Sequence, residues 1–263
     1  MLKVTLPASI VVNFAQINID LSMLAIVSLA LLGGFIYIGM AFLINLRADK
    51  EQRAFDLINL PGYNIGLVAL PFVQNFVGPV GVVAAGLFDA GNAFISLGGT
   101  YGIASSVKDG SGFSFKRIGK ALVSSIPFMS YILMLLINLV GITVPKPILS
   151  FADILKNANT FMAMLMIGVG FKLNIEKKHI AHVLKIIIVR YSVAAAIAAG
   201  FFYLLPFSYE IRQTLVLMAF SPIGASTPAF TQELRSDVGL SSVINSSCII
   251  ISICLMTALM VFM

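Results

Sequence analysis

Two interruptions inside apolar segments, both rich in proline and glycine, constrain this chain more than any other feature. The first is LPGYNIGLVALP (60–71) and the second is SPIGASTP (221–228). Proline removes a backbone donor and glycine lowers helix propensity, so both stretches are predicted to leave the helical conformation. Backbone opened at membrane depth must find partners in protein or in a water-filled cavity. Two interrupted helices, one in each half, point to the binding site of a secondary transporter.

The composition places these interruptions in a membrane. The chain has 263 residues, of which 59% are hydrophobic and only 11% are charged, whereas soluble domains carry about 25% charged residues. The net charge of +6 does not indicate a nucleic-acid partner, because the basic residues fall in short clusters between apolar runs. Such clusters orient helices in a bilayer. We therefore predict an all-α polytopic membrane protein.

The apolar runs predict about nine transmembrane helices. Their approximate ranges are 4–19, 21–45, 55–77, 79–105, 118–141, 149–171, 181–205, 211–232 and 238–262. Thirteen of the 17 Lys and Arg residues fall into connectors on one side. The positive-inside rule then puts the N-terminus in the cytoplasm and the C-terminus outside, in the cytoplasmic (plasma) membrane.

The connector SVKDGSGFS (106–114) divides the chain into two predicted inverted-topology repeats. Residues 1–107 form a first repeat of four helices with broken helix 55–77. Residues 108–117 form a cytoplasmic linker, and residues 118–263 form a second repeat of five helices with broken helix 211–232. Ile65, Gly66 and Gln74 recur 158 positions later as Ile223, Gly224 and Gln232. The broken helix is third of four in one repeat and fourth of five in the other, so we expect one helix to be missing at the front.

Several short motifs carry a resemblance to a known family. They are Asn64-x-Gly66-x4-Pro71, Gly78-Pro79-x-Gly81, Phe88-Asp89-x-x-Asn92, Gly168-x-Gly170, Arg190 and the run from Pro228 to Asp237-x-Gly239-x-Ser241. In order and spacing the chain resembles the auxin efflux carrier family, within the bile/arsenite/riboflavin transporter superfamily. The resemblance covers essentially the whole chain.

The resemblance implies a fold of inverted repeats whose two broken helices cross, and it implies transport of small organic anions such as dicarboxylates or auxin-like carboxylic acids. Spans 21–105 and 181–262 would form a moving core. Spans 4–19 and 118–171 would form a scaffold and the surface of an expected homodimer. Alternating access around the crossing would move the substrate through the lipid bilayer.

Asp89 is the most informative single residue. It lies about ten residues into its span, near the membrane midplane, where a charged Asp costs about 2.5–3.5 kcal/mol on insertion scales. Burial disfavours its charged form, which suits Asp89 to a role in proton coupling. The alternative is a structural carboxylate bonded to Asn92 or to a neighbouring helix.

Arg190 has two readings of equal weight. It could bind a substrate carboxylate in a bidentate manner, or it could extend to the cytoplasmic surface beside Lys185.

Neutral groups and helix breaks supply the rest of the predicted substrate site. Half-helix N-termini favour an anionic ligand. The predicted site residues at this depth are Asn64, Gly66, Pro71, Asn92, Ser221, Pro222, Ser226, Thr227, Pro228 and Asn245.

Other functions find little support in the sequence. There is no GxxxxGK[ST] loop, and no Ser/His/Asp arrangement assembles at one depth, so we expect no enzyme activity. Cys248 and Cys254 lie on different faces of one apolar segment, so neither a disulfide nor a metal pair is expected. His179 and His182 are predicted to be surface residues. We expect no cofactor.

Two alternatives to a proton-coupled transporter stay open. One is a sodium-coupled symporter of the bile-acid type, in which Gln74, Asn92, Asn245 and opened carbonyls coordinate the ion. The other is a non-transporting or truncated membrane subunit.

Overall fold

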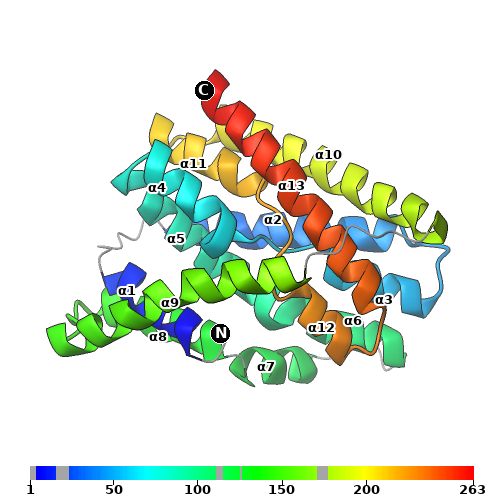
Figure 1. Cartoon of the computed structure of the whole chain (residues 1–263), viewed down its shortest axis with the longest axis horizontal. Coiled ribbons are helices and arrows are strands. Elements are labelled where there is room, and N and C mark those ends of the chain that lie inside the picture. Colours follow the sequence, from blue (N-terminus) through cyan, green and yellow to red (C-terminus); the bar gives the residue numbers. More distant parts are fainter. Residues whose placement is uncertain (1–3, 16–23, 111–114, 125, 171–176) are drawn as a thin grey trace.

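The computed structural model describes residues 4–15, 24–110, 115–124, 126–170 and 177–263, and every regular element in these residues is helical (Figure 1). The α-helices are α1 (Thr5–Ala15), α2 (Leu24–Leu43), α3 (Lys50–Asn59), α4 (Leu70–Phe76), α5 (Pro79–Phe94), α6 (Thr100–Asp109), α7 (Phe115–Ser124), α8 (Ile126–Leu139), α9 (Lys146–Gly170), α10 (Ile180–Leu204), α11 (Tyr209–Ala219), α12 (Thr227–Glu233) and α13 (Val238–Phe262). The predicted all-α class is confirmed for this part of the chain.

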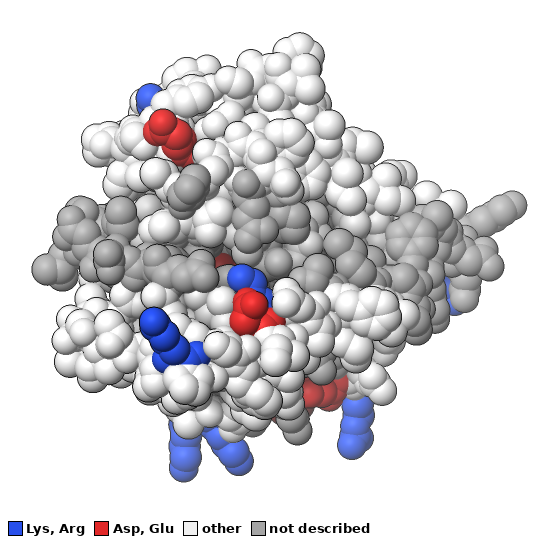
Figure 2. Space-filling view, turned by 60° about the vertical axis from the view of Figure 1, so that its left-hand side comes forward, with Lys and Arg blue, Asp and Glu red and all other residues white. Residues whose placement is uncertain are grey.

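Four helical segments in the described residues are long and apolar enough to cross a bilayer. They are Leu24–Leu43, Val80–Asp109, Ile180–Leu204 and Val238–Phe262. A helix of 20 residues is about 30 Å long, which matches the hydrocarbon core of a membrane. Among the described residues in Figure 2, Lys, Arg, Asp and Glu side chains occupy only small parts of the surface. Large apolar side chains, such as Phe35 and Leu133, are exposed on the molecule. The protein is therefore an integral membrane protein.

Both predicted interruptions are confirmed. Helix α3 ends at Asn59, and helical backbone resumes with a π-helical turn, Ile65–Ala69, that runs into α4. Helix α11 ends at Ala219, and α12 begins at Thr227. Because each interrupted segment is divided into two short helices, neither is counted among the four long ones. The number of nine spans and the repeat boundaries stay predictions, and part of the predicted linker 108–117 lies outside the described residues.

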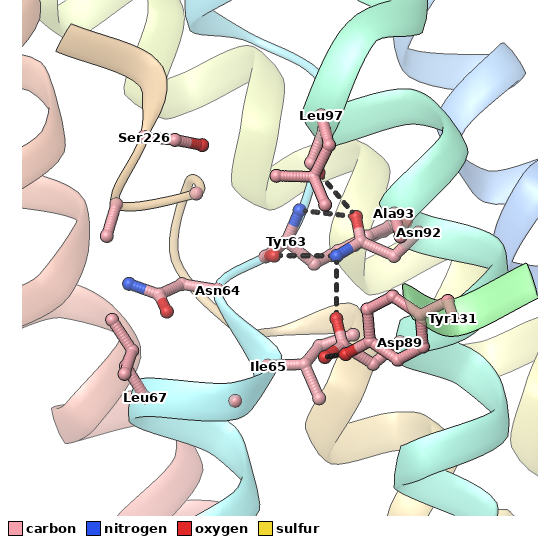
Figure 3. Close-up of a pocket in the computed structure, with 14 residues that line it drawn as sticks. Tyr63, Asn64, Ile65, Leu67, Asp89, Asn92, Ala93, Leu97, Tyr131 and Ser226 are labelled. Atoms are coloured by element: carbon pink, nitrogen blue, oxygen red, sulfur yellow. Dashed lines mark hydrogen bonds between the residues drawn. The ribbon is translucent and has the colours of Figure 1, made fainter. Parts of the chain in front are cut away.

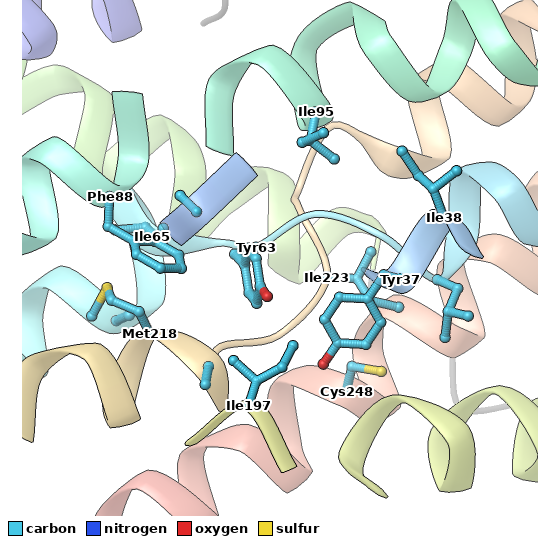
Figure 4. Close-up of a cluster of buried hydrophobic side chains, with 14 of the residues drawn as sticks. Tyr37, Ile38, Tyr63, Ile65, Phe88, Ile95, Ile197, Met218, Ile223 and Cys248 are labelled. Atoms are coloured by element: carbon cyan, nitrogen blue, oxygen red, sulfur yellow. The ribbon is translucent and has the colours of Figure 1, made fainter. Parts of the chain in front are cut away.

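The main hydrophobic core surrounds the two unwound segments (Figure 4). The Tyr63 ring lies edge-on between Tyr37 of α2 and Phe88 of α5, with ring centroids 5.8 and 5.4 Å away. Helices α2 and α5 approach closely at Gly91, where an added Cβ would lie 2.3 Å from the Val27 carbonyl oxygen. A glycine at this position therefore sets the helix spacing beside the crossing.

Helices α8 and α9 both pack against α1 and form a second group with it. The Asn138 side chain of α8 donates to the Phe14 carbonyl of α1 at 2.6 Å, and the Phe14 and Tyr131 rings meet edge to face. A small apolar cluster that includes Phe14, Tyr131 and Ala93 joins this group to α5. The α5–α8 contact thus connects the second group to the main core.

Candidate functional site: the crossing of the two unwound segments

The two interrupted segments meet directly. The backbone N–H of Asn64, in the first segment, donates to the carbonyl oxygen of Pro222, in the second, at 2.8 Å. Gly62 has φ +82°, and a Cβ there would lie 2.5 Å from the Ser96 hydroxyl oxygen. Only glycine combines this conformation with so close an approach. The crossing is therefore fixed by backbone contact between segments almost 160 residues apart.

Arg190 of α10 binds both unwound segments. Its NH1 donates to the Leu60 carbonyl at 2.6 Å, and its NH2 donates to the carbonyls of Gly62 and Ser221, both at 2.9 Å. The guanidinium also lies over the Tyr37 and Tyr63 rings. Within the described residues its Nε has no hydrogen-bond partner. Arg190 is completely buried, so the alternative in which it extends to the cytoplasmic surface is wrong.

A second polar network joins the helices that flank the crossing. Ser241 of α13 donates to Asn59 Oδ1 at 2.5 Å, and Asn59 Nδ2 donates to Thr231 of α12 at 3.2 Å. All three side chains are completely buried. Asn245, also on α13, donates to the Gly224 carbonyl at 2.9 Å. These bonds satisfy polar groups that would otherwise be costly at membrane depth.

A cavity of about 70 Å³ opens beside the crossing (Figure 3). The first unwound segment and its π-helical turn, the second unwound segment, α5 and α8 all contribute to its wall. Its lining residues are Tyr63, Asn64, Ile65, Gly66, Leu67, Asp89, Asn92, Ala93, Ser96, Leu97, Tyr131, Gly224, Ala225 and Ser226. Two of these residues, Ser96 and Leu97, lie in a second π-helical turn, Ile95–Gly99. Such turns recur at functional sites because they displace backbone from the regular ladder.

Asn92 and Asp89 form the polar wall of this cavity. Asn92 accepts from the Tyr63 N–H at 2.9 Å and donates to the Tyr63 carbonyl at 2.8 Å, so its amide replaces the helical partners that Tyr63 lacks. Asn92 also donates to Asp89 Oδ1 at 3.1 Å. The hydroxyl of Tyr131, on α8, donates to Asp89 Oδ2. Asp89 therefore contacts both the main core and the second helix group.

Asn64 carries an unused donor at the site. Its side chain is 5% exposed, and its Nδ2 has no hydrogen-bond partner in the described part of the chain. Figure 3 shows this amide directed away from Asp89, on the side of Leu67 and Ser226. A buried amide that lacks a partner costs free energy, and a bound ligand could supply that partner.

The structure brings part of the predicted site together. Asn64, Gly66, Asp89, Asn92 and Ser226 line the cavity. The other predicted residues are not among its lining residues. The carbonyls of Pro222 and Ser221 accept the bonds described above, and Arg190 and Asn245 donate to backbone carbonyls. Thr227 and Pro228 lie in the first turn of α12, and Pro71 lies in the first turn of α4. Their predicted substrate role stays a prediction.

Sequence reasoning missed Tyr131 and one further cluster. The only available signal for Tyr131 was that its hydroxyl lies in the apolar segment 118–141. The completely buried carboxylate of Asp56 lies 2.6 Å from His182 Nε2 and 3.7 Å from Lys185 Nζ, and it accepts from Asn45 at 2.8 Å. The His182 side chain is 20% exposed, so it is a surface residue on one side and pairs with a buried carboxylate on the other. No spacing along the sequence indicated this pairing.

The described residues contain no group of three or more His, Cys, Asp or Glu side chains placed to hold a metal ion. No protein-family model matches the chain, and no curated protein matches it significantly.

Proposed function

We propose that this protein is a secondary active transporter that moves small organic acids across the cytoplasmic membrane by alternating access. The observation that carries the proposal is the cavity at the crossing of two interrupted membrane segments. Unwound backbone at membrane depth is tolerated where it is buried in protein or lines a cavity, and transporters bind substrates at such places.

The order of the elements also supports the proposal. A long helix, an interrupted segment and a second long helix follow one another in α2–α6 and again in α10–α13. This order is the one expected of two inverted repeats in a fold of nine spans that resembles the auxin efflux carrier family. The N-terminus would lie inside and the C-terminus outside. Helices α8 and α9 expose apolar side chains, including Leu136, Phe151 and Ile154, on the surface expected for a homodimer.

Asp89 is the proposed site of proton coupling. It lines the cavity on α5 and accepts a bond from Tyr131 on α8, so its protonation would act where the proposed core meets the proposed scaffold. Neutralising the carboxylate should therefore uncouple transport from the proton gradient.

Uptake into proteoliposomes under an imposed pH gradient tests the function. Labelled glycolate, lactate, malonate and malate form the panel, and protein-free vesicles give the background. We expect gradient-driven accumulation of at least one acid, its loss in Asn64→Ala, and loss of the gradient dependence in Asp89→Asn. Gln232→Ala removes an exposed amide that is not among the residues lining the cavity and should leave uptake unchanged.

Replacing external sodium with potassium in the same assay tests the sodium-coupled alternative. Uptake that requires sodium and ignores pH would support that alternative. Failure to take up any acid, in protein that still melts cooperatively, would contradict the transporter proposal and favour a non-transporting subunit.

A further inference from the structure

The cavity at the crossing contains a carboxylate and no counter-charge. Asp89 lines it, whereas no Lys, Arg or His side chain appears among the described lining residues. Arg190, the nearby cation, directs its terminal nitrogens to backbone carbonyls and is absent from the lining. The other titratable residues that line the cavity are Tyr63 and Tyr131, whose hydroxyls ordinarily stay protonated near neutral pH.

An organic anion that enters this cavity would therefore meet a second negative charge. Two carboxylates about 4 Å apart repel each other strongly, because the effective dielectric constant of a protein interior is far below that of water. A single shared proton removes the repulsion and makes a short, strong O–H···O bond, as in carboxylate pairs that titrate together. A proton is thus the simplest counter-charge that the site can accept with its substrate.

The geometry of Asp89 leaves room for that proton. A carboxylate offers about four acceptor positions, and Asn92 and Tyr131 occupy two of them. Gly66 has no side chain in front of Oδ2, where even an added Cβ would lie 3.8 Å away. Asn64 lines the same cavity, and rotation of its side chain would bring the unpaired Nδ2 to a second oxygen of the same ligand.

The volume of the cavity favours a small ligand. Its volume of about 70 Å³ is about half of the roughly 150 Å³ that accommodates a benzene ring in an apolar protein cavity. A short acid with one carboxyl group fits this space better than an aromatic acid. A dicarboxylate would also bring another negative charge for which the described lining residues offer no cation.

We propose that the site binds a short monocarboxylic acid, such as glycolate, together with one proton that the substrate carboxyl group shares with Asp89. This inference rests on the proposed function and makes it more specific. The carboxyl group lies toward Asp89, and the second polar oxygen accepts from the Asn64 amide. Substrate and proton then enter as an electroneutral pair.

Titration calorimetry of the full chain in detergent, near neutral pH, tests the inference. Measuring glycolate binding in two buffers of different ionisation enthalpy gives the number of protons taken up. We expect about one proton per glycolate and at least about tenfold weaker binding of malonate. Asp89→Asn should bind glycolate without proton uptake, because a neutral amide can receive the anion directly. Gln232→Ala is the matched control.

Glycolate binding that neither takes up a proton nor weakens as the pH rises above neutral would overturn the inference, as would tighter binding of malonate. Neither result needs a variant, so the test holds even if Asp89→Asn does not fold. Accumulation of malonate without protons would overturn the inference and leave the transporter proposal intact. Absence of binding by any acid, in folded protein, would contradict both.

Discussion

The polar groups around Arg190 and those around the cavity belong to one crossing, yet they are satisfied to different degrees. Near Arg190, three carbonyls of the unwound segments accept bonds from a single guanidinium. At the cavity, the Asn64 side chain is buried without a partner. Asn64 itself shows the contrast, because its backbone N–H is paired across the crossing and its amide is not. The carbonyls that accept from Arg190 hold the fold, and the unpaired Nδ2 of Asn64, which lies at the cavity, is available to a ligand. Substitutions ordered by their expected effect on the free energy of unfolding test this division.

Arg190→Met should have the largest effect. It leaves the buried carbonyls of Leu60, Gly62 and Ser221 without this donor, at about 1–3 kcal/mol each, so we expect a loss of at least about 3 kcal/mol in the free energy of unfolding. Thermal melting in detergent measures it. Arg190→Lys keeps the charge but not the planar pair of donors and should recover only part of the loss. A melting temperature equal to that of the unmodified protein would show that the bonds from Arg190 do not stabilise the fold.

Asn59→Ala should come next. It removes the amide that joins Thr231 and Ser241 and leaves their buried hydroxyls with fewer partners. We expect a loss of about 2 kcal/mol in the free energy of unfolding. The double variant Asn59→Ala/Ser241→Ala should lose less than the sum of the single variants, since both belong to one network. Simple additivity would show that the network is not cooperative.

Glu51 provides an exposed pair for contrast. Hydrogen bonds from Lys108 and Ser236 lower the pKa of Glu51 from its ordinary value of 4.5, so the pair stabilises the fold at neutral pH and this contribution disappears as the pH falls through the acidic range. Glu51 is half-exposed, so solvent screening keeps the effect to a few tenths of a kcal/mol. Melting of Glu51→Gln and the unmodified protein should therefore differ slightly at neutral pH and converge in acid. A gap that persists in acid would assign the difference to another cause.

Asn64→Ala should leave stability almost unchanged. Its Nδ2 makes no hydrogen bond to the described residues, so we expect the free energy of unfolding to change by no more than about 0.5 kcal/mol. Glycolate binding should nevertheless be lost. Calorimetry and thermal melting on the same preparation separate the two outcomes. Lost binding accompanied by a large drop in melting temperature would place Asn64 with the structural group instead.

The sequence predicts the interruptions well because proline and glycine act locally. The breaks after Asn59 and Ala219 follow from Pro61, Gly62 and Pro222, whatever the rest of the chain does. Pairing between distant helices is a different matter. Asp56 and His182 meet across 126 positions, and neither residue has neighbours in sequence that indicate the other. The same holds for Asp89 and Tyr131, so the residue types at the site were partly predictable and their partners were not.

Because Arg190 donates to both interruptions, the two interruptions are expected to evolve together. A substitution that restored regular helix at 221–228 would withdraw the Ser221 carbonyl from the guanidinium and leave part of a buried charge unsatisfied at membrane depth, where its cost is highest. A chain could therefore restore regular helix at one interruption only if it also replaced Arg190. That replacement would leave the carbonyls of the other interruption without their donor. Homologues that keep either break should keep both together with the arginine, and an alignment of such homologues would show the three positions changing as a unit.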